Sequence, residues 1–189
     1  ELDNPFTNND AFSTLEEELE AVTDYLSNWS DYSKIVIADS NHHDFLTKWV
    51  QKVDWKKLKG TGNQATYLRL AQLLSDINEN GGSILQELLG EFDGNVRYLN
   101  KDESFRVGNV ELSMHGHLGA NGARGGSNSF NHIGLKTVTG HTHSASINKS
   151  HYCCGTSTNL RLGYTKGLSS WSNTHVIVFN DGKRQMFTT

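Results

Sequence analysis

Lys34-Ile35-Val36-Ile37-Ala38-Asp39-Ser40-Asn41-His42-His43-Asp44 joins a short apolar run to a polar segment that carries two histidines. The apolar run predicts a buried strand, and the spacing of the apolar residues from Phe45 to Val50 predicts a helix after the polar segment. A strand, a loop and a helix in this order indicate an α/β protein. Polar residues at the carboxyl end of a strand lie where such proteins bind ligands, so the amide and imidazoles can reach a metal or a phosphate.

Two further strands are predicted to end in histidine-bearing loops. His115-Gly116-His117 follows the alternating segment Val110–Met114, and Gly140-His141-Thr142-His143 follows Lys136–Thr139. A neutral imidazole is a good ligand for zinc, manganese or iron. Each loop taken alone is also explained by a solvated turn, so the prediction of a metal site depends on the three loops together.

The rest of the chain predicts helices first and strands later. Helical spacing covers residues 15–26, 64–80 and 83–92, and strand-like patterns cover residues 96–99, 104–107, 110–114, 136–139, 144–147, 152–157, 175–179 and 184–187. The chain has 189 residues, of which 35% are hydrophobic, and this length favours one domain over residues 1–189. We find no apolar run of the roughly 18 residues that a membrane span needs, and no signal peptide.

The histidine loops also carry a family resemblance. Their order, Asn-His, then His-Gly, then Gly-His-x-His, resembles the later motifs of the calcineurin-like metallophosphoesterases. The segment from His115 to Gly125, followed by Gly163-Tyr164 and Lys166–Ser172, looks like a phage-encoded branch associated with DNA transfer and DNA degradation. The resemblance runs from about Asn41 to Arg184 and implies a four-layer α/β/β/α sandwich.

The resemblance implies a role for each motif residue. Asn41, His115 and His141 would bind one metal ion, and His143 would bind a second. His42 would donate a proton to the leaving group or stabilise charge on the phosphoryl oxygens. Two such ions lower the pKa of a bound water and neutralise the phosphate, which is how a poor leaving group is displaced.

The sequence departs from this family in two places. Upstream of Asn41 the family has Asp-x-His and then an Asp that bridges both metals, and we find neither motif in Glu1–Asp39. We therefore expect a chain that lacks its first strands, with at most one tightly held ion. His43 stands where the family has an acid that orients the neighbouring histidine, and Asp44 is the candidate to replace that acid.

Arg124 and His117 are the predicted substrate-binding residues. Arg124 lies among Gly119, Gly122 and Gly125, whose backbone amides can approach a phosphate closely, and guanidinium matches phosphate oxygens in a bidentate way. The alternative is a mobile connecting loop. We expect His117 outside the metal shell, toward the phosphate.

Charge and the remaining polar residues leave several alternatives open. The net charge of −4 argues against coating nucleic acid by bulk electrostatics. A locally basic face and ordinary solvated charges both explain the cations Arg124, Lys136, Arg161, Lys166, Lys183 and Arg184. The segment from Tyr164 to Trp171 either stacks on a nucleotide or forms a turn with an aromatic anchor. We expect Cys153 and Cys154 to be reduced strand residues, and His132 and His151 to be structural or exposed. His175 opens a strand and is either a half-buried packing residue or a residue near the substrate.

These observations predict a metal-dependent phosphodiester hydrolase, a DNA nuclease that uses divalent ions, with Mn²⁺ first and Fe, Zn or Mg as alternatives. The alternatives are a catalytically inactive metal-binding or interaction module and a small-molecule phosphatase. The expected location is the host cytoplasm, with DNA as substrate and no membrane partner. The sequence gives no oligomeric state, strand preference or cutting mode.

Overall fold

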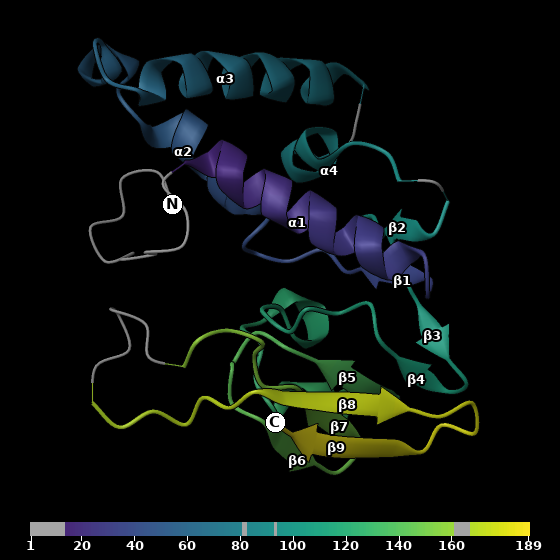
Figure 1. Ribbon diagram of the computed structural model, residues 1–189. Helices are drawn as coiled ribbons and strands as arrows, with labels where there is room; N and C mark the ends of the chain where they lie inside the picture. The colour runs from purple at the N-terminus through teal and green to yellow at the C-terminus, as the bar shows by residue number, and fades with distance from the viewer. Residues whose placement is uncertain (1–13, 81–82, 93, 161–166) are drawn as a thin grey trace. The chain divides into compact units, whose positions relative to one another are not determined.

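A computed structural model of the chain describes residues 14–80, 83–92, 94–160 and 167–189 (Figure 1). The chain is mixed α/β, as predicted. It divides into two compact units. We call them the helical unit, with the described residues up to Ile37 and Asn41–Tyr98, and the sheet unit, with Ala38–Ser40 and Leu99–Thr189. The division does not test the expectation of one domain, which stays a prediction.

The helical unit contains most of the helices. Its elements are α1 (Leu15–Ser30), β1 (Ile35–Ile37), α2 (Asp44–Lys52), η1 (Trp55–Leu58), α3 (Asn63–Asn80), α4 (Ile84–Leu89) and β2 (Val96–Tyr98). The predicted strand, loop and helix around residues 34–50 are confirmed as β1, a turn and α2. The two strands pair in parallel, with Ile35 opposite Val96. None of the helices within the described ranges has the length and apolar character that a membrane crossing requires.

One apolar cluster holds the helices of this unit together. Val50 of α2, Leu70 of α3 and Ile84 of α4 are buried and pack against one another. The ring of Trp49 meets the ring of Tyr67 edge-on, with 5.9 Å between their centroids. Helical spacing places these residues on the inner faces, so burial of the apolar stripe stabilises three helices at once.

The sheet unit is built on five strands. Its elements are β3 (Arg106–Val107), β4 (Val110–Glu111), η2 (Ala120–Gly122), η3 (Ser129–His132), β5 (Lys136–Thr139), β6 (Ser146–Asn148), β7 (His151–Cys153), β8 (Thr174–Val178) and β9 (Arg184–Thr188). The five-stranded sheet has the order β3-β4-β5-β7-β6, and β8 pairs with β9 as a separate hairpin (Figure 1). The central strands β4, β5 and β7 are parallel, whereas β3 and β6 are antiparallel to their neighbours.

The core of the sheet unit surrounds β5 and β7. Thr137 and Val138 are buried, and His151 is only 1% exposed. The His151 ring stacks on Phe130 at 4.6 Å between centroids, and its Nδ1 lies 2.9 Å from the Thr137 hydroxyl. Burial, with the nearby charge of Arg184, lowers the pKa of His151 below its usual value. The predicted structural role of His151 is confirmed.

Arg184 fastens the β8–β9 hairpin to the five-stranded sheet. Its guanidinium donates to the carbonyl oxygens of Thr137 (3.0 Å) and Ser150 (2.6 Å) and lies 4.1 Å from the centre of the Tyr152 ring. A guanidinium presents several donors in a fixed plane, which suits this pair of carbonyls. Arg184 is therefore a structural cation of the sheet unit, whereas the sequence suggested either part of a locally basic face or an ordinary solvated charge.

Glu111 on β4 is a buried carboxylate that organises the β3–β4 hairpin. It is 5% exposed and accepts hydrogen bonds from the hydroxyl of Ser104 (2.6 Å), the backbone N–H of Phe105 (2.9 Å), the Arg106 guanidinium (2.9 Å) and the hydroxyl of Ser113 (2.8 Å). Burial raises the pKa of Glu111, but these hydrogen bonds outweigh it and lower the pKa to about 2. Because Ser113 turns back to this carboxylate, β4 ends at Glu111, short of the predicted Met114.

Replacing Glu111 by Gln should destabilise the fold. The amide places two N–H donors among groups that already donate. We therefore expect the free energy of unfolding, measured with urea at pH 7, to fall by roughly 2–3 kcal/mol. Because the folded pKa of Glu111 lies below the unfolded value of 4.5, this stabilisation is complete above that value. It is lost as the pH falls toward 2, and the gap between wild type and variant should close over that range. Glu91→Gln, at an exposed position, is the control, and a pH-independent gap would contradict the assignment.

Candidate functional site

Two histidine loops meet at one end of the sheet unit. Strands β4 and β5 are adjacent and parallel, with Val110 opposite Lys136. The loops that follow them therefore leave the same edge of the sheet. The backbone N–H of Gly140 donates to the carbonyl oxygen of His115 at 2.8 Å, which ties one loop directly to the other.

Glycine permits this close approach. Gly116 has a φ of +112°, and a Cβ on it would lie 3.0 Å from the Thr139 hydroxyl oxygen and 3.1 Å from the Gly140 carbonyl oxygen. On its other side, the N–H of Gly125 donates to the carbonyl of His117 at 2.9 Å. A Cβ on Gly125 would overlap the Gly116 carbonyl. Three backbone segments therefore pack together without side chains between them.

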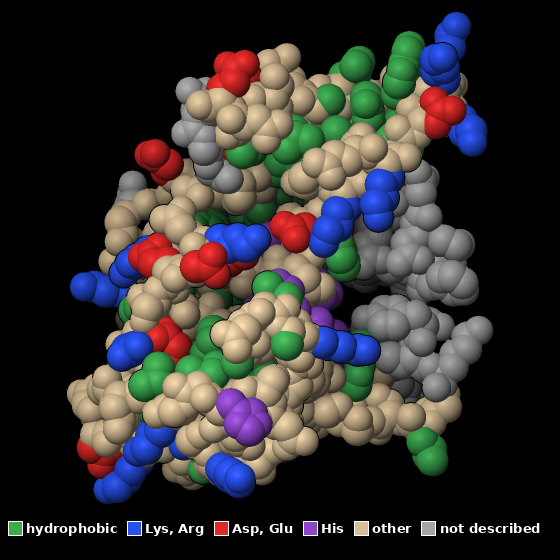
Figure 2. Space-filling model, turned by 180° about the vertical axis from the view of Figure 1, so that it is seen from behind, with side chains coloured by type: hydrophobic (Ala, Val, Ile, Leu, Met, Phe, Trp, Pro, Cys, Tyr) green, Lys and Arg blue, Asp and Glu red, His purple; other side chains and the backbone are tan. Residues whose placement is uncertain are grey.

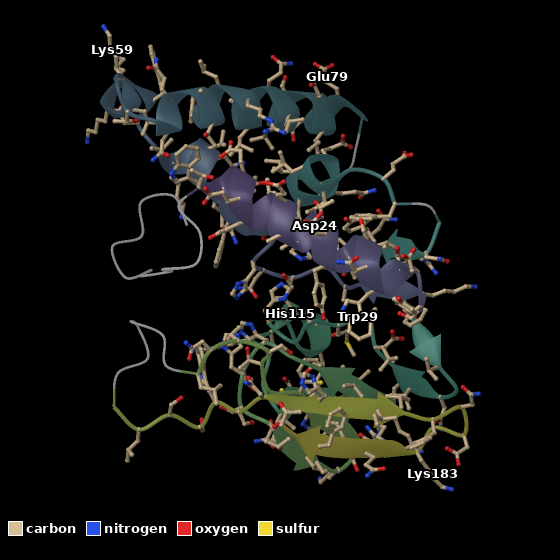
Figure 3. The ribbon with its side chains drawn as sticks, viewed as in Figure 1. Asp24, Trp29, Lys59, Glu79, His115 and Lys183 are labelled. Atoms are coloured by element: carbon tan, nitrogen blue, oxygen red, sulfur yellow. The ribbon has the colours of Figure 1, made fainter. Side chains whose placement is uncertain are left out.

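The loop contact brings three imidazoles together. The ring centroids of His115 and His141 are 5.2 Å apart, those of His115 and His117 are 5.7 Å apart, and those of His117 and His141 are 6.1 Å apart. Figure 3 labels His115 at this end of the sheet unit. The structure thus brings together two predicted metal ligands, His115 and His141, with the predicted substrate residue His117. We call these three residues the histidine cluster.

The second loop has an unusual backbone. His141 and His143 both adopt left-handed conformations, with φ of +70° and +58°. Such a conformation costs a residue with a side chain about 1–2 kcal/mol. Strained backbone of this kind concentrates at functional sites, where the surrounding structure enforces it. Two strained histidines in one four-residue loop mark it as a candidate site.

Strand β7 supports this loop from beneath. The thiol of Cys153, which is 1% exposed, donates to the Gly140 carbonyl at 3.1 Å and lies 3.1 Å from the Thr142 hydroxyl. Cys153 and Cys154 are both free thiols, as predicted. Burial, with the neighbouring Cys153, raises the pKa of Cys154 to about 11, so Cys154 stays protonated and unreactive near neutral pH.

His143 contacts an aromatic partner. Its ring meets the Trp171 ring edge-on at 4.1 Å between centroids, and its carbonyl accepts from the N–H of Ser172 at 3.2 Å. This contact favours the alternative in which Trp171 is the aromatic anchor of a turn. Tyr164, also named for nucleotide stacking, lies outside the described residues.

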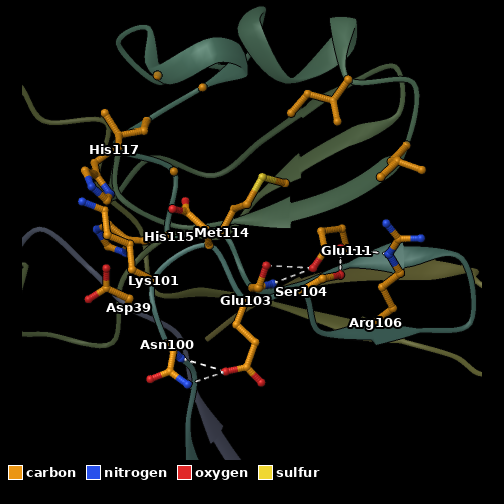
Figure 4. Close-up of a pocket in the computed structure, with 18 residues that line it drawn as sticks. Asp39, Asn100, Lys101, Glu103, Ser104, Arg106, Glu111, Met114, His115 and His117 are labelled. Atoms are coloured by element: carbon orange, nitrogen blue, oxygen red, sulfur yellow. Dashed lines mark hydrogen bonds and ion pairs between the residues drawn. The ribbon is translucent and has the colours of Figure 1, made fainter. Parts of the chain in front are cut away.

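A cavity of about 380 Å³ opens beside the histidine cluster. His115 and His117 line it, together with Asp39, Lys101 and Glu111 (Figure 4). In the view of Figure 4 the two histidines, Asp39 and Lys101 occupy one side, and the hydrogen bonds of Glu111 the other. Its volume falls in the range of small-ligand pockets.

Asp39 is a site residue that sequence reasoning missed. It lies two residues beyond the end of β1, at Ile37, and lines the same cavity as His115 and His117. The signal was present, because a polar residue just beyond the carboxyl end of a strand is where such proteins bind ligands. Asp39 is not part of an Asp-x-His motif, so a motif alone does not identify it.

Asn41 and His42 belong to the helical unit. The Asn41 side-chain oxygen is buried and accepts no hydrogen bond, and the exposed His42 ring lies 4.8 Å from the Phe45 ring. The Asp44 carboxylate pairs with Lys48 at 3.2 Å. Three points stay predictions. They are a ligand set that joins Asn41 to the histidine cluster, the orientation of His42 by Asp44, and the catalytic role of His42.

The predicted basic residues mostly serve the fold. Lys136 donates to the Gly182 carbonyl at 3.2 Å, and Lys183, at the hairpin turn labelled in Figure 3, pairs with Asp181 at 3.0 Å. Arg124 is exposed, and its segment bridges to Leu118. Lys and Arg side chains are interspersed with acidic ones on the face in Figure 2. Arg161 and Lys166 lie outside the described residues.

The donor set suits a divalent ion, although the atoms are not yet converged on one. Imidazole nitrogens are ligands for zinc, iron and manganese, and the buried Nδ1 of His117 has no hydrogen-bond partner. Within the described part of the chain, no group of three or more His, Cys, Asp or Glu side chains forms a ready-made metal site.

The chain is similar to a protein of a bacteriophage. The chain is 35% identical over 162 residues to the protein named Protein A1 of Escherichia phage T5. The match covers 82% of the chain and 29% of the T5 protein, so the chain spans less than a third of that relative. Neither a known protein family nor a solved structure matches the chain. The similarity is therefore to a phage protein whose printed name states no activity.

Gly116→Ala should loosen the loop contact. Gly122 also has a positive φ, +73°, but a Cβ there meets nothing within 4 Å, so Gly122→Ala measures backbone strain alone. We expect about 1 kcal/mol of destabilisation for Gly122→Ala and roughly 2–4 kcal/mol for Gly116→Ala. The loss is larger for Gly116→Ala because its new Cβ also crowds Thr139 and Gly140. Urea unfolding of both variants measures this difference. Equal losses would show that the two loops do not pack as closely as described.

Proposed function

We propose that the chain is part of a phage-encoded, metal-dependent phosphodiester hydrolase of calcineurin-like type whose substrate is DNA. The proposal includes the four-layer α/β/β/α arrangement. The observation that carries it is the meeting of the His115 and His141 loops beyond two adjacent parallel strands. The similarity to a T5 phage protein supports the phage origin.

The chemistry of a phosphodiester explains why such a site needs these residues. The anionic oxygens repel a nucleophile, and the alkoxide is a poor leaving group. A divalent ion at the site would lower the pKa of a water and offset the phosphate charge. His115 and His141 would hold the ion through neutral imidazoles, Asn41 would offer an amide oxygen, and His42 would donate a proton to the leaving oxygen.

Asp39 adds a carboxylate to the proposed site, in a segment that has no Asp-x-His motif. It lies on the wall of the cavity beside His115 and His117. A carboxylate there can orient the attacking water by accepting its proton. Lys101, which also lines this cavity, supplies positive charge for a phosphate oxygen.

Two other functions remain as alternatives. The cavity of about 380 Å³ is large enough for a single nucleotide, which favours a small-molecule phosphatase. The lack of a ready-made ion site among the described residues favours an inactive module that keeps the loops for binding. Substrate comparison separates these functions.

The test is hydrolysis of four substrates: duplex DNA, single-stranded DNA, a nitrophenyl diester and a nitrophenyl monoester. Each is assayed with Mn²⁺ for the 189-residue chain and for the full product of its gene. We expect cleavage of DNA and the diester, with little cleavage of the monoester.

Two variants connect the activity to the site. His141→Ala and Asp39→Asn should each lower the rate by about 100-fold or more, because a metal ligand or a base is lost. His132→Ala, at an exposed position that does not line the cavity, should leave the rate unchanged. Monoester cleavage alone would replace the proposal by the phosphatase, and inertness of both proteins toward all four substrates would replace it by the inactive module.

A further inference from the structure

We propose that side chains of α2 and η1 form a surface of the helical unit that binds single-stranded DNA. We call it the α2–η1 face, and Figure 3 labels Lys59 at its end. The inference goes beyond the proposed function, because none of these side chains belongs to the histidine loops. It rests on the proposed function only for the choice of DNA. The face consists of Phe45, Lys48, Lys52, Trp55, Lys56, Lys57 and Lys59.

Positive charge is concentrated in this part of the chain. Five of the 17 Lys and Arg residues lie between residues 44 and 59, with only two acids, although the whole chain carries a net charge of −4. Asp44 pairs with Lys48 at 3.2 Å, and the Asp54 carboxylate caps η1 by accepting the N–H of Lys56 at 3.2 Å. Among the described residues, the other three lysines pair with no acid. The face therefore attracts a polyanion such as a phosphate backbone.

Helical spacing brings an aromatic ring and two lysines to one side of α2. Phe45, Lys48 and Lys52 are three, four and seven positions apart, which places them on one stripe of the helix. Together with Trp49 and Val53 they line a groove of about 360 Å³. The Phe45 side chain is 47% exposed, and both lysines are exposed. The groove thus combines apolar walls with ammonium groups that reach solvent.

Trp55 adds a second aromatic side chain next to this groove. It is 51% exposed and opens η1, two residues after Val53 of the groove. The backbone that carries it is ordered by buried Leu58 and by the Lys57 N–H, which donates to the Asp54 carbonyl at 2.9 Å. A half-exposed indole held in this way can stack on a nucleobase. Bases within a duplex are already stacked on their neighbours, so the partner is a single strand.

The α2–η1 face begins beside His42. The rings of His42 and Phe45 lie 4.8 Å apart, and His42 is the residue to which the proposed function assigns proton donation. The stretch of α2 from Phe45 to Lys52 extends about 10 Å at 1.5 Å per residue, enough to contact more than one nucleotide. This continuity assigns the face to DNA, whereas charge alone would also suit an anionic membrane surface.

Binding without hydrolysis tests the inference. The full chain is titrated, in EDTA, into a fluorescently labelled oligothymidylate of about 20 nucleotides, which exceeds the length of one such binding site. Fluorescence anisotropy gives the affinity. We expect tighter binding of this strand than of a DNA duplex of the same length, of an oligouridylate RNA, or of vesicles that contain phosphatidylserine.

Two variants separate stacking from charge. Trp55→Ala should weaken binding of the oligothymidylate by about 10-fold, because one stacked base is lost. Lys56→Gln combined with Lys57→Gln should also weaken it by about 10-fold at 0.1 M salt. The double variant should flatten the slope of log affinity against log salt concentration by about 1.4, because two phosphate contacts are lost.

Matched controls carry the same changes elsewhere on the surface. Tyr32→Ala removes an aromatic side chain that is 85% exposed. Lys149→Gln combined with Lys183→Gln neutralises two exposed lysines of the sheet unit. Each control should change the affinity by less than about twofold. Thermal unfolding of every variant checks the fold, and the exposed lysine pair decides the outcome where Trp55→Ala melts early.

The outcomes separate this inference from the proposed function. Equal losses in variants and controls overturn the inference. Wild-type binding of the duplex, the RNA or the vesicles that is as tight as that of the single strand also overturns it. Mn²⁺-dependent DNA cleavage by a chain whose binding is independent of Trp55 and the lysines overturns this inference alone. Binding that depends on them, in a protein that cleaves no diester, overturns only the proposed function.

Discussion

The contact between the loops after β4 and β5 is made by backbone, and everything at the candidate site depends on it. The Gly140 N–H reaches the His115 carbonyl at 2.8 Å. That distance is available because Gly116 carries no side chain to hold Thr139 away. Parallel pairing of β4 with β5 brings the loops to the same edge, and glycine then lets them touch. The imidazole rings of His115, His117 and His141, which flank this contact, are therefore neighbours.

Strain in the second loop is offset by the strand beneath it. Two left-handed histidines cost roughly 2–4 kcal/mol together. The buried thiol of Cys153 and the hydroxyl of Thr142 hold the loop through the Gly140 carbonyl and one another. Burial of Thr137 and Val138, with the hydrogen bonds of Arg184 to the Thr137 and Ser150 carbonyls, holds β5, the strand that leads into the loop. Rigid support of a strained loop is what a preorganised binding site requires.

The sequence predicted helices and strands, which follow from the local periodicity of apolar residues. It did not predict most contacts between residues that are distant in the chain and close in space. The strand at Lys136–Thr139 is confirmed as β5, and the helix predicted over residues 64–80 is confirmed as α3 with one more residue. The meeting of His115 with His141 followed from strand ends alone. Arg184 was misread because its carbonyl partners lie 34 and 47 residues away. Asp39 belongs to no motif, and its position just beyond the end of β1 is the feature that identifies it.

The charge of the cluster bears on how an ion would act there. Glu111 lines the same cavity, yet its oxygens are committed to Ser104, Phe105, Arg106 and Ser113. Asp39 also lines this cavity, and our proposal assigns its carboxylate to the attacking water. A dication held by neutral imidazoles keeps most of its positive charge, whereas carboxylate ligands would cancel it. Neutral ligands would therefore leave more positive charge on an ion to attract a phosphate and to lower the pKa of a bound water.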